Sequence, residues 1–430
     1  MSTRSLLDRL DAVQPVVARR DRYYRGAQSL RFMVDKVDGT VMGFKSNLAR
    51  VAVQAVAERI RLQDVTATIG GVDDSERARR LVQDCDFPMV LQSIVTDMLA
   101  VGSAYLIVWV DGSGRPVITG ESAEQVAVER DPITRAVTSA VKRWEVKDAN
   151  GVVTAEHVVL YGPKDIVHLT RDDKRGRLTF VGKVPNPLGV VPVVPLINVE
   201  RIHDDVGASV VDDLAPLLDA LNKLIVDMMT TSEAVARPKR WATGVSLEDD
   251  DDGFVADGGF TADGGVEPLD VEAVSDGAKI PFRDADDMWV TEQAEAKFGQ
   301  LPGADMSGYR TAVDLVMQQI MAVTSLPAHM VGITTANPST AEALRAAEVA
   351  LSTNAEGRVR VINRPVEWAV RLLVAIDAGC SPDDVAVDVS WADTFTRSIA
   401  QEADAAMKLH AEGVATTDEA RLMVGAEKEI

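Results

Sequence analysis

A stripe of apolar residues in the middle of the chain constrains the fold more than any other feature. Between residues 212 and 236, apolar side chains recur at steps of three and four. This spacing predicts an amphipathic helix of about seven turns, roughly 37 Å long, and Pro216 is tolerated in its first turn. Taken alone, the stripe is typical of a core helix. It consists of Leu214, Leu217, Leu218, Leu221, Leu224, Ile225 and Met228.

The segment that follows, residues 237–287, has a different character. A basic cluster and an acidic run precede two copies of one hexapeptide, FVADGG and FTADGG. Phenylalanine at every sixth position among Asp-Gly-Gly favours a β-ribbon with loops over a packed core. We expect a small insertion between helices, since helical patterns resume over residues 286–298 and 309–325. Its distinctive side chains are Arg237, Lys239, Arg240, Trp241, Phe254 and Phe260.

The first two hundred residues mix helices with strands. Helices are predicted over residues 2–20 with an interruption near Pro15, from a cap at Asn47, and from about residue 73 to 99 with a break at Pro88. The connections between the strands that follow are too short for helical crossovers, which predicts an antiparallel sheet. These strands are expected over residues 104–110, 125–129, 136–147, 152–161 and 166–170.

A sharply bounded helix is predicted after residue 339. Ser339 and Glu342 match a capping box, in which each side chain accepts a hydrogen bond from the other residue's backbone amide. Pro338 biases the residue before it away from helical geometry. The helix should cover residues 340–358 and continue toward residue 376, with Pro365 as a bend or break. A strand over 385–389 and a helix over 399–411 complete an α+β fold that is mainly helical.

Charge and cysteine content argue against several classes of protein. The formal net charge is -21, from 66 acidic and 45 basic residues. Such a surface repels nucleic acid wherever the charge is not locally inverted, which disfavours tight sequence-specific DNA binding. Cys85 and Cys380 form no CxxC pair, so neither a disulfide framework nor a zinc site is supported. No apolar run approaches the ~20 residues of a membrane helix, and no signal peptide is recognised.

The motif search predicts no catalytic, cofactor or metal-binding residues. Five residues lie between Gly176 and Gly182, where a phosphate loop has four, and Val184 stands where such a loop needs Ser or Thr. If Gly253 took the sixth position of a calcium loop, Gly259 would replace the required glutamate. No histidine belongs to a HExxH motif or neighbours a GxSxG serine. An α/β hydrolase with a helical cap, and an oligomeric scaffold unrelated to DNA, stay open as alternatives.

Six segments stand in a recognisable order along the chain. They are RYYRGAQSL (22–30), LGVVPVVPLIN (188–198), LPGADMSGY (301–309), SLPAHMVG (325–332), PSTAEALRAAE (338–348) and WADTFTRSIAQEADAAMKLHAEG (391–413). With these segments the chain resembles the portal proteins of tailed bacteriophages, specifically the Gp6-like group of actinobacterial phages.

The resemblance implies a ring, usually of twelve subunits, around a DNA channel. Each subunit would have an α/β wing, a two-helix stem, a small β/loop clip between the stem helices and a C-terminal helical crown. The expected boundaries are 1–205 for the wing, 206–236 for the first stem helix, 237–287 for the clip, 288–327 for the second stem helix region, 328–340 for the tunnel loop, 341–378 for its support helix returning to the wing, and 379–430 for the crown.

The same resemblance implies roles for individual residues. The capping pair Ser339 and Glu342 would support the tunnel loop, while Lys297 and Arg345 are candidate basic residues of the channel. The clip side chains named above would contact the large terminase subunit of the packaging motor and the head–tail adaptor. The DNA-facing loop residues would be Gly332, Ile333, Thr334, Thr335, Ala336 and Asn337.

The implied partners are those of a capsid vertex. Double-stranded DNA would pass through the channel without sequence-specific contacts, and the major capsid and scaffolding proteins would surround the ring. The subunit would be found at one vertex of the virion after assembly in the cytoplasm of the bacterial host. It would be neither an enzyme nor a membrane protein.

Overall fold

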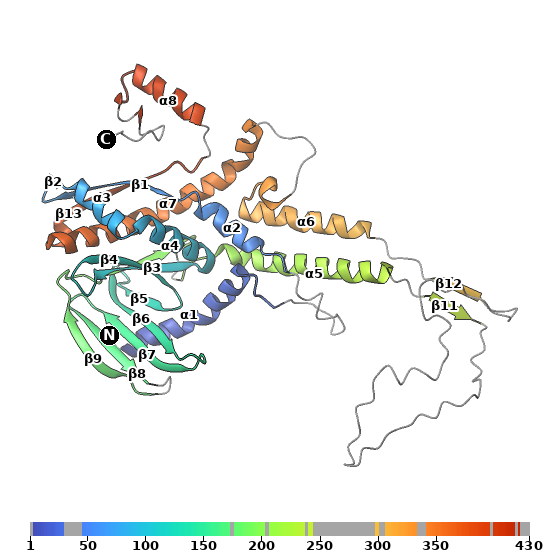
Figure 1. The fold of residues 1–430 in the computed structure, drawn as a ribbon, viewed down its shortest axis with the longest axis horizontal. Coiled ribbons are helices and arrows are strands. Elements are labelled where there is room, and N and C mark those ends of the chain that lie inside the picture. Colours follow the sequence, from blue (N-terminus) through green and yellow to red (C-terminus); the bar gives the residue numbers. More distant parts are fainter. Residues whose placement is uncertain are drawn as a thin grey trace, which may run out of the picture. The chain divides into compact units, whose positions relative to one another are not determined.

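The computed structural model describes residues 3–29, 45–172, 176–202, 206–236, 240–243, 297–300, 306–332, 341–395, 399–417 and 420–421. The chain divides into two units, one of residues 1–225 with 311–430 and one of residues 226–310. Figure 1 shows the elements along the chain. Within the described ranges, no helix combines the length and the apolar character that crossing a membrane requires.

The first helix, α1 (Thr3–Tyr24), runs through Pro15 without interruption, so the predicted break is wrong. Leu10 and Val17 lie on either side of the proline and are both fully buried, whereas Pro15 is exposed. Both halves of the helix therefore pack their apolar faces into the protein. This packing outweighs the backbone hydrogen bond that proline removes.

Three further helices precede β3 along the chain: α2 (Leu48–Ala57), α3 (Ser75–Asp84) and α4 (Phe87–Val101). The predicted break lies at Cys85 and Asp86, and Pro88 occupies the first turn of α4, where its missing amide costs no helical hydrogen bond. Asn47 holds the N-cap position of α2, but its side chain makes no capping hydrogen bond, so that part of the prediction is wrong.

Three antiparallel sheets form the described β-structure of the first unit, which confirms the antiparallel prediction. A five-stranded sheet has the order β5-β6-β7-β8-β9, and two three-stranded sheets have the orders β10-β3-β4 and β13-β1-β2. Sequence reasoning missed β1, β2, β4, β9 and β10. The strands are β1 (Leu62–Ile69), β2 (Val72–Asp73), β3 (Ser103–Val110), β4 (Pro116–Ser122), β5 (Val126–Arg130), β6 (Val137–Lys147), β7 (Val153–Tyr161), β8 (Asp165–Arg171), β9 (Thr179–Pro185) and β10 (Val193–Ile197).

The last strand corrects one predicted boundary. β13 (Val385–Trp391) follows the short helix η4 (Pro382–Asp384) and pairs with β1, from Leu62 opposite Trp391 to Ile69 opposite Val385. Residues 385–391 thus belong to the sheet that contains β1 and β2, and the strand ends two residues beyond its predicted limit at residue 389. The alternating sequence indicated a strand, but a partner more than 300 residues away leaves no local signal. The helix α8 (Ile399–Ala411) agrees with its predicted range.

The longest helix, α7 (Ala341–Ala378), has 38 residues and passes through Pro365. Leu351, Ile362, Val370 and Leu373 on it are fully buried and belong to the main hydrophobic core. In Figure 1 the helix lies beside β13 and α3. Next to the proline, the Trp391 indole donates to Asn363 Oδ1 at 2.7 Å. The core packing and this contact keep the two halves of α7 in one helix.

The second unit contains a two-stranded ribbon. β11 (Arg240–Thr243) and β12 (Lys297–Gln300) pair antiparallel, with Arg240 opposite Gln300 and Thr243 opposite Lys297. The helix predicted over residues 286–298 is therefore wrong at its end, where residues 297 and 298 belong to β12. Along the chain, β11 follows α5 (Val210–Ala236) and β12 precedes α6 (Ser307–Thr324). Both helices agree with the predicted ranges to within three residues.

Candidate functional site

The two helices that flank the ribbon pack together. In the first unit, Leu214, Leu218 and Leu221 of α5 and Met317 and Ile320 of α6 belong to the same buried core. In the second unit, the hydroxyls of Thr231 and Tyr309 lie 3.0 Å apart and join the end of α5 to the start of α6. The predicted leucine stripe thus forms a helix pair whose chain ends are connected through the inserted segment.

The beginning of α5 is held by two polar contacts from α1. Arg20, which is buried, donates to both carboxylate oxygens of Asp212, at 3.1 and 2.5 Å, and to the Val101 carbonyl at 2.6 Å. Further along both helices, the Tyr23 hydroxyl of α1 lies 2.9 Å from each carboxylate oxygen of the buried Asp219 of α5. Pairing matters most for the buried Arg20 and Asp219, because a buried charge without a partner is strongly destabilising. Two acidic residues of α5 are thus structural.

Two glycines allow the chain to enter α5 next to the end of α4. A Cβ atom built on Gly207 would lie 2.0 Å from the Gly102 carbonyl oxygen, and one built on Gly102 would lie 2.7 Å from the Gly207 oxygen. Both residues have positive φ, 99° and 81° for Gly102 and Gly207 respectively. The Ser209 side chain then caps α5, because its Oγ accepts from the Val211 amide at 3.0 Å and donates to the Ala100 carbonyl at 2.5 Å.

The helix α7 is fixed to the same corner. The Arg358 guanidinium donates to Asn198 Oδ1 at 2.6 Å and to Glu200 at 2.7 Å. The Nδ2 group of Asn198, which is fully buried, donates to the Ala208 carbonyl at 2.7 Å. The segment that leads into α5 and the middle of α7 therefore share one hydrogen-bond network. Its bonds from the Arg358 guanidinium are charge-assisted, and they hold this segment against α7.

The connection from α6 toward α7 begins with a tight reversal. Ser325 has φ 58°, a left-handed conformation that costs a non-glycine residue energy. A short 3₁₀ helix, η3 (Ala328–Val331), follows and ends at Gly332 with φ 77°. The extended Pro327 separates this turn from α6. Backbone geometry on this side of the loop is thus defined up to Gly332.

One carboxylate anchors this turn to the far side of the loop. Glu348 lies on α7, and its Oε1 is 3.3 Å from Nε2 of His329 in η3, while its Oε2 accepts at 3.0 Å from Arg59, which lies in the turn directly after α2. The Arg59 and Glu348 side chains are 13% and 16% exposed. A partly buried carboxylate shared by a guanidinium and an imidazole thus ties the end of α2 to η3 and α7. Residues 333–340 are connected to this anchor at both ends.

A comparison with known proteins identifies the family. The family model described as phage portal protein, SPP1 Gp6-like, matches residues 6–424. The chain belongs to this portal protein family. The resemblance found in the sequence is confirmed.

Two portal proteins of mycobacterial phages are related in sequence. The chain is 30% identical over 317 residues to the portal protein of Mycobacterium phage L5, covering 72% of this chain and 60% of that protein. It is 29% identical over 303 residues to the portal protein of Mycobacterium phage D29, covering 69% and 57%. The matches thus span less than two thirds of the length of these relatives.

Two chains from solved structures of gene transfer agent particles were compared with this chain. A chain from the virion of the native particle matches with a TM-score of 0.48 and 13% identity, covering 96% of this chain and 93% of that chain. A chain from the neck of the native particle, computed with C12 symmetry, matches with a TM-score of 0.47 and 14% identity over the same shares.

Most site residues predicted for this portal chain fall outside the described residues. These are Ile333, Thr334, Thr335, Ala336, Asn337, Ser339, Arg237, Lys239, Phe254 and Phe260. Gly332 is described and ends η3. Arg240 and Trp241 lie on β11, and Glu342 and Arg345 lie in α7, but their side chains are outside the description. Lys297 is exposed on β12 of the ribbon rather than on a stem helix.

Sequence reasoning missed the anchor that the structure reveals. His329 had been assigned no role, and Glu348 was only the last letter of a recognised segment. The one available signal was an acidic residue among alanines and valines on a helix that is otherwise apolar at that point. Its partner Arg59 is 289 positions away, so no local pattern could pair them. Within the described residues, no group of three or more His, Cys, Asp or Glu could hold a metal ion.

Proposed function

We propose that the chain is the subunit of a phage portal, in which twelve copies form a ring around a DNA channel at one vertex of the capsid. The single observation that supports this most is the portal family match over residues 6–424, in a chain whose helices α5 and α6 enclose an inserted segment. A closed ring needs two different complementary faces on each subunit. Exposed apolar side chains on α6, Leu315 and Val323, are suited to such a contact.

In this proposal α5 and α6 form the stem, and the ring conducts DNA without binding it tightly. Twelve copies carry twelve times -21, or -252, formal charges. DNA adheres to proteins largely because lysine and arginine neutralise its phosphates and thereby release the counterions condensed on it. An acidic wall offers few such contacts, so the polyanion slides. Lys297 and Arg345 remain candidates for weak contacts along the channel.

The loop around residues 332–337 is proposed to face the DNA. Its polar, uncharged side chains can touch the backbone of DNA without holding it. The anchor formed by Arg59, His329 and Glu348 supports this role, because it fixes one end of the loop against α7. The Ser339–Glu342 capping box would define the other end. A loop held at both ends can move only between its anchors.

The inserted segment is proposed to be the clip. The pairing of β11 with β12 closes its base, which brings the two ends of residues 244–296 together. Arg237, Lys239, Arg240, Trp241, Phe254 and Phe260 would contact the large terminase subunit during packaging and the head–tail adaptor afterwards. Aromatic side chains and arginine are enriched at protein interfaces.

The remaining partners follow from the same position. The N-terminal sheets, now including β13, would form the wing that meets the major capsid and scaffolding proteins. The subunit would assemble in the host cytoplasm and remain in the virion. It would contribute no chemistry of its own, and the motor would supply the energy for packaging.

Native mass spectrometry of the purified chain tests this proposal. A ring of twelve subunits of 46.3 kDa has a mass of about 0.56 MDa. Monomers alone at micromolar concentration would contradict the proposal, whereas closed rings of a neighbouring subunit number would support it and correct only the count.

A further inference from the structure

The outer strands of the sheets decide where the first unit can accept a further strand. An outer strand leaves a row of backbone amides and carbonyls unpaired, and proteins keep such an edge free by a bulge, a proline, a lysine, a very short strand or a covering element. The three described sheets of the first unit have six outer strands: β5 and β9, β4 and β10, β2 and β13. Five of these strands are protected.

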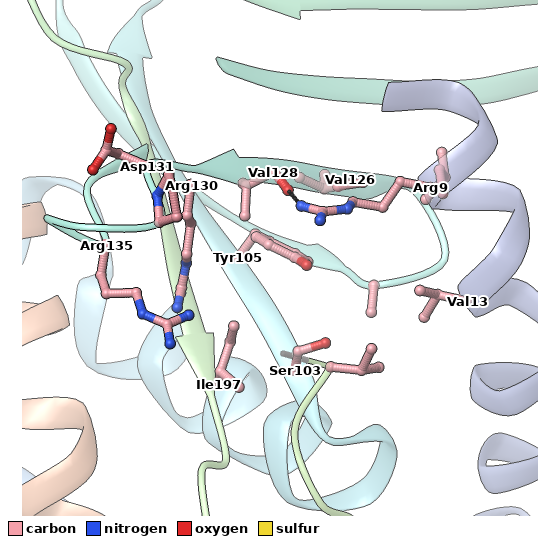
Figure 2. A pocket seen from close by; sticks show the side chains of 15 residues that line it. Arg9, Val13, Ser103, Tyr105, Val126, Val128, Arg130, Asp131, Arg135 and Ile197 are labelled. Atoms are coloured by element: carbon pink, nitrogen blue, oxygen red, sulfur yellow. Dashed lines mark hydrogen bonds between the residues drawn. The ribbon is translucent and has the colours of Figure 1, made fainter. Parts of the chain in front are cut away.

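Both outer strands of the five-stranded sheet are protected, each by different means. Figure 2 shows Arg9 reaching from α1 to β5, where its Nη1 donates to the Val128 carbonyl at 2.9 Å, so the helix covers this edge. On β9, a β-bulge leaves Val181 without a partner residue on β8. The exposed Lys183 and the final Pro185 complete the protection of β9.

Three outer strands of the smaller sheets are covered, buried or very short. On β4, a Cβ atom built on Gly120 would lie 2.8 Å from Cγ1 of Ile94 in α4, and Sγ of Cys85 lies 3.5 Å from the Pro116 carbonyl oxygen. Four of the five residues of β10 are buried, and β2 has only two residues. None of these strands offers a long free edge to a partner.

The strand β13 lacks every one of these protections. It has seven residues, and among the described strands it pairs with β1 alone. It contains no lysine and no proline, and its residues follow one another in register without a bulge of their own. The exposed side chains of Ala386, Asp388 and Ser390 are too short to shield the backbone. An unprotected edge of this kind is a template for a further strand.

Two backbone hydrogen bonds show which groups face the free edge of β13. The Ala392 amide donates to the Arg61 carbonyl, and the Asp384 carbonyl accepts from the Gly70 amide, both at 2.9 Å, so even-numbered residues turn toward β1. An antiparallel ladder alternates along the strand, so the odd-numbered residues turn their backbone groups away from β1. These residues are Val385, Val387 and Val389, whose side chains are buried. The free edge therefore presents backbone donors and acceptors at every second residue, which another extended strand complements.

The charge around this edge is negative. Asp383 and Asp384 lie in η4 directly before the strand, and Asp388 lies at its middle. All three are exposed, and no lysine or arginine of the described ranges forms an ion pair with them. On an added strand, the side chain opposite Asp388 would have its Cβ atom about 5 Å away. Pairing of β13 with β13 of a second copy would bring carboxylates together, whereas a lysine or arginine on the added strand would be attracted.

We propose that β13 binds an extended, basic segment of another protein as a fourth strand of the β13-β1-β2 sheet. The segment carries a lysine or arginine opposite Asp388 on the solvent-facing side of the sheet. The residues between its polar ones are apolar, because they lie on the side that packs against α7. Backbone hydrogen bonds provide the affinity, and the carboxylates select the charge of the segment. The inference does not depend on the portal role, since a ring can form without this strand.

Fluorescence anisotropy on the full-length protein tests the site. The probe is a labelled heptapeptide with blocked ends, Thr-Val-Lys-Val-Lys-Val-Thr. A second peptide has glutamate in place of both lysines, and a third has proline in place of the central valine. The lysine peptide should bind about tenfold more tightly than either, because the second is repelled and the third cannot form the strand. Equal binding of the lysine and proline peptides would show attraction by net charge alone and would overturn the proposal.

One charge reversal and a matched control locate the binding. Asp388→Lys should reverse the preference, so that the glutamate peptide binds more tightly than the lysine peptide. Glu412→Lys makes the same charge change at an exposed residue after α8 and should leave the preference as it is. Both side chains are exposed, so the melting temperature should not change in either variant. An unaltered preference in Asp388→Lys would overturn the proposal.

Hydrogen exchange reports where the peptide binds. Exchange of residues 385–391 should slow when the lysine peptide is added, and unchanged exchange in this range would contradict the proposal. If Asp388→Lys changed only the sedimentation of the protein without peptide, the edge would pair between copies of this chain, and the proposal would be wrong. Native mass spectrometry of the ring reports on the portal role separately, so the two proposals can fail independently.

Discussion

Oε1 of Glu348 lies 3.3 Å from Nε2 of His329. This contact joins η3, which precedes residues 333–340, to α7, which follows them. The same carboxylate also accepts from Arg59, so three elements depend on one side chain. The Arg59 and Glu348 side chains are only slightly exposed to solvent, which makes these two charges costly to separate.

Replacing the anchor carboxylate should loosen the loop. Glu348→Gln leaves the mostly buried Arg59 without a full counter-charge, and we expect the free energy of unfolding to fall by about 1–3 kcal/mol. Hydrogen exchange should increase in η3 and in the first turns of α7. Glu356→Gln is the matched control, because Glu356 lies on the same helix in an exposed ion pair with Arg360. Equal effects of the two variants on unfolding and exchange would show that the anchor has no special role.

The approach of Gly207 to Gly102 predicts a large cost for one methyl group. Gly207→Ala places a Cβ atom 2.0 Å from a carbonyl oxygen, so the entry to α5 must shift. We expect a loss of about 3 kcal/mol or more in the free energy of unfolding, since both overlap and left-handed strain contribute. Chemical denaturation measures it.

Gly151→Ala is the control for that measurement. Gly151 has φ 79°, close to the 81° of Gly207, but nothing lies within 4 Å of its added Cβ atom. Its loss should be about 1 kcal/mol, from backbone strain alone. A similar loss for both variants would refute the importance of the close approach.

Asp97 should make stability depend on pH in an unusual direction. Burial raises the pKa of its carboxyl, although a hydrogen bond from Ser122 opposes this. A raised folded-state pKa means that the contribution of Asp97 is fully present below its unfolded pKa of about 3.9 and is lost as pH rises through the folded value. Asp97→Asn should therefore raise the melting temperature, and by more at pH 8 than at pH 4.5.

Asp64 provides the opposite case. Two hydrogen bonds from Arg79, at 2.7 and 2.8 Å, lower the pKa of this carboxyl. Its contribution is present above the unfolded pKa and is lost only as pH falls below it. Asp64→Asn should therefore lower the melting temperature by nearly the same amount at pH 4.5 and pH 8. If both variants shifted the melting temperature in the same direction at pH 8, the assignment of Asp97 would be wrong.

Local patterns predicted most helices and several strands, because burial imposes a period on the sequence. The leucine stripe located α5 to within two residues at its start, and β6 and β7 were each placed to within one residue. The break predicted at Pro15 was wrong, because the burial of Leu10 and Val17 on either side of the proline keeps α1 continuous. Local patterns indicate an element's type but not the tertiary contacts that override it.

Contacts between distant segments could not be predicted in the same way. The pairing of β13 with β1 and the bond from Arg59 to Glu348 join residues roughly 300 positions apart. The strand β13 could be predicted from its alternating sequence, but its partner could not. Sequence motifs likewise supplied the family, whereas the contact of Arg59 and His329 with Glu348 became visible only in the fold.

The proposed DNA-facing loop can be tested by deletion. Removing residues 334–337 should leave ring assembly intact, because the anchor and the stem helices are untouched, but impair DNA packaging or retention. A four-residue Gly-Ser replacement keeps the length and separates loop geometry from side-chain chemistry. Loss of the ring on deletion would mean that the segment is a subunit interface instead.

Cryo-electron microscopy of the purified assembly can show whether the subunits form a ring around a channel. We expect a closed ring, with α5 and α6 of each subunit around a central channel and residues 333–337 reaching into it. An assembly without a channel, or a ring whose channel is lined by the five-stranded sheet instead of these helices, would contradict it.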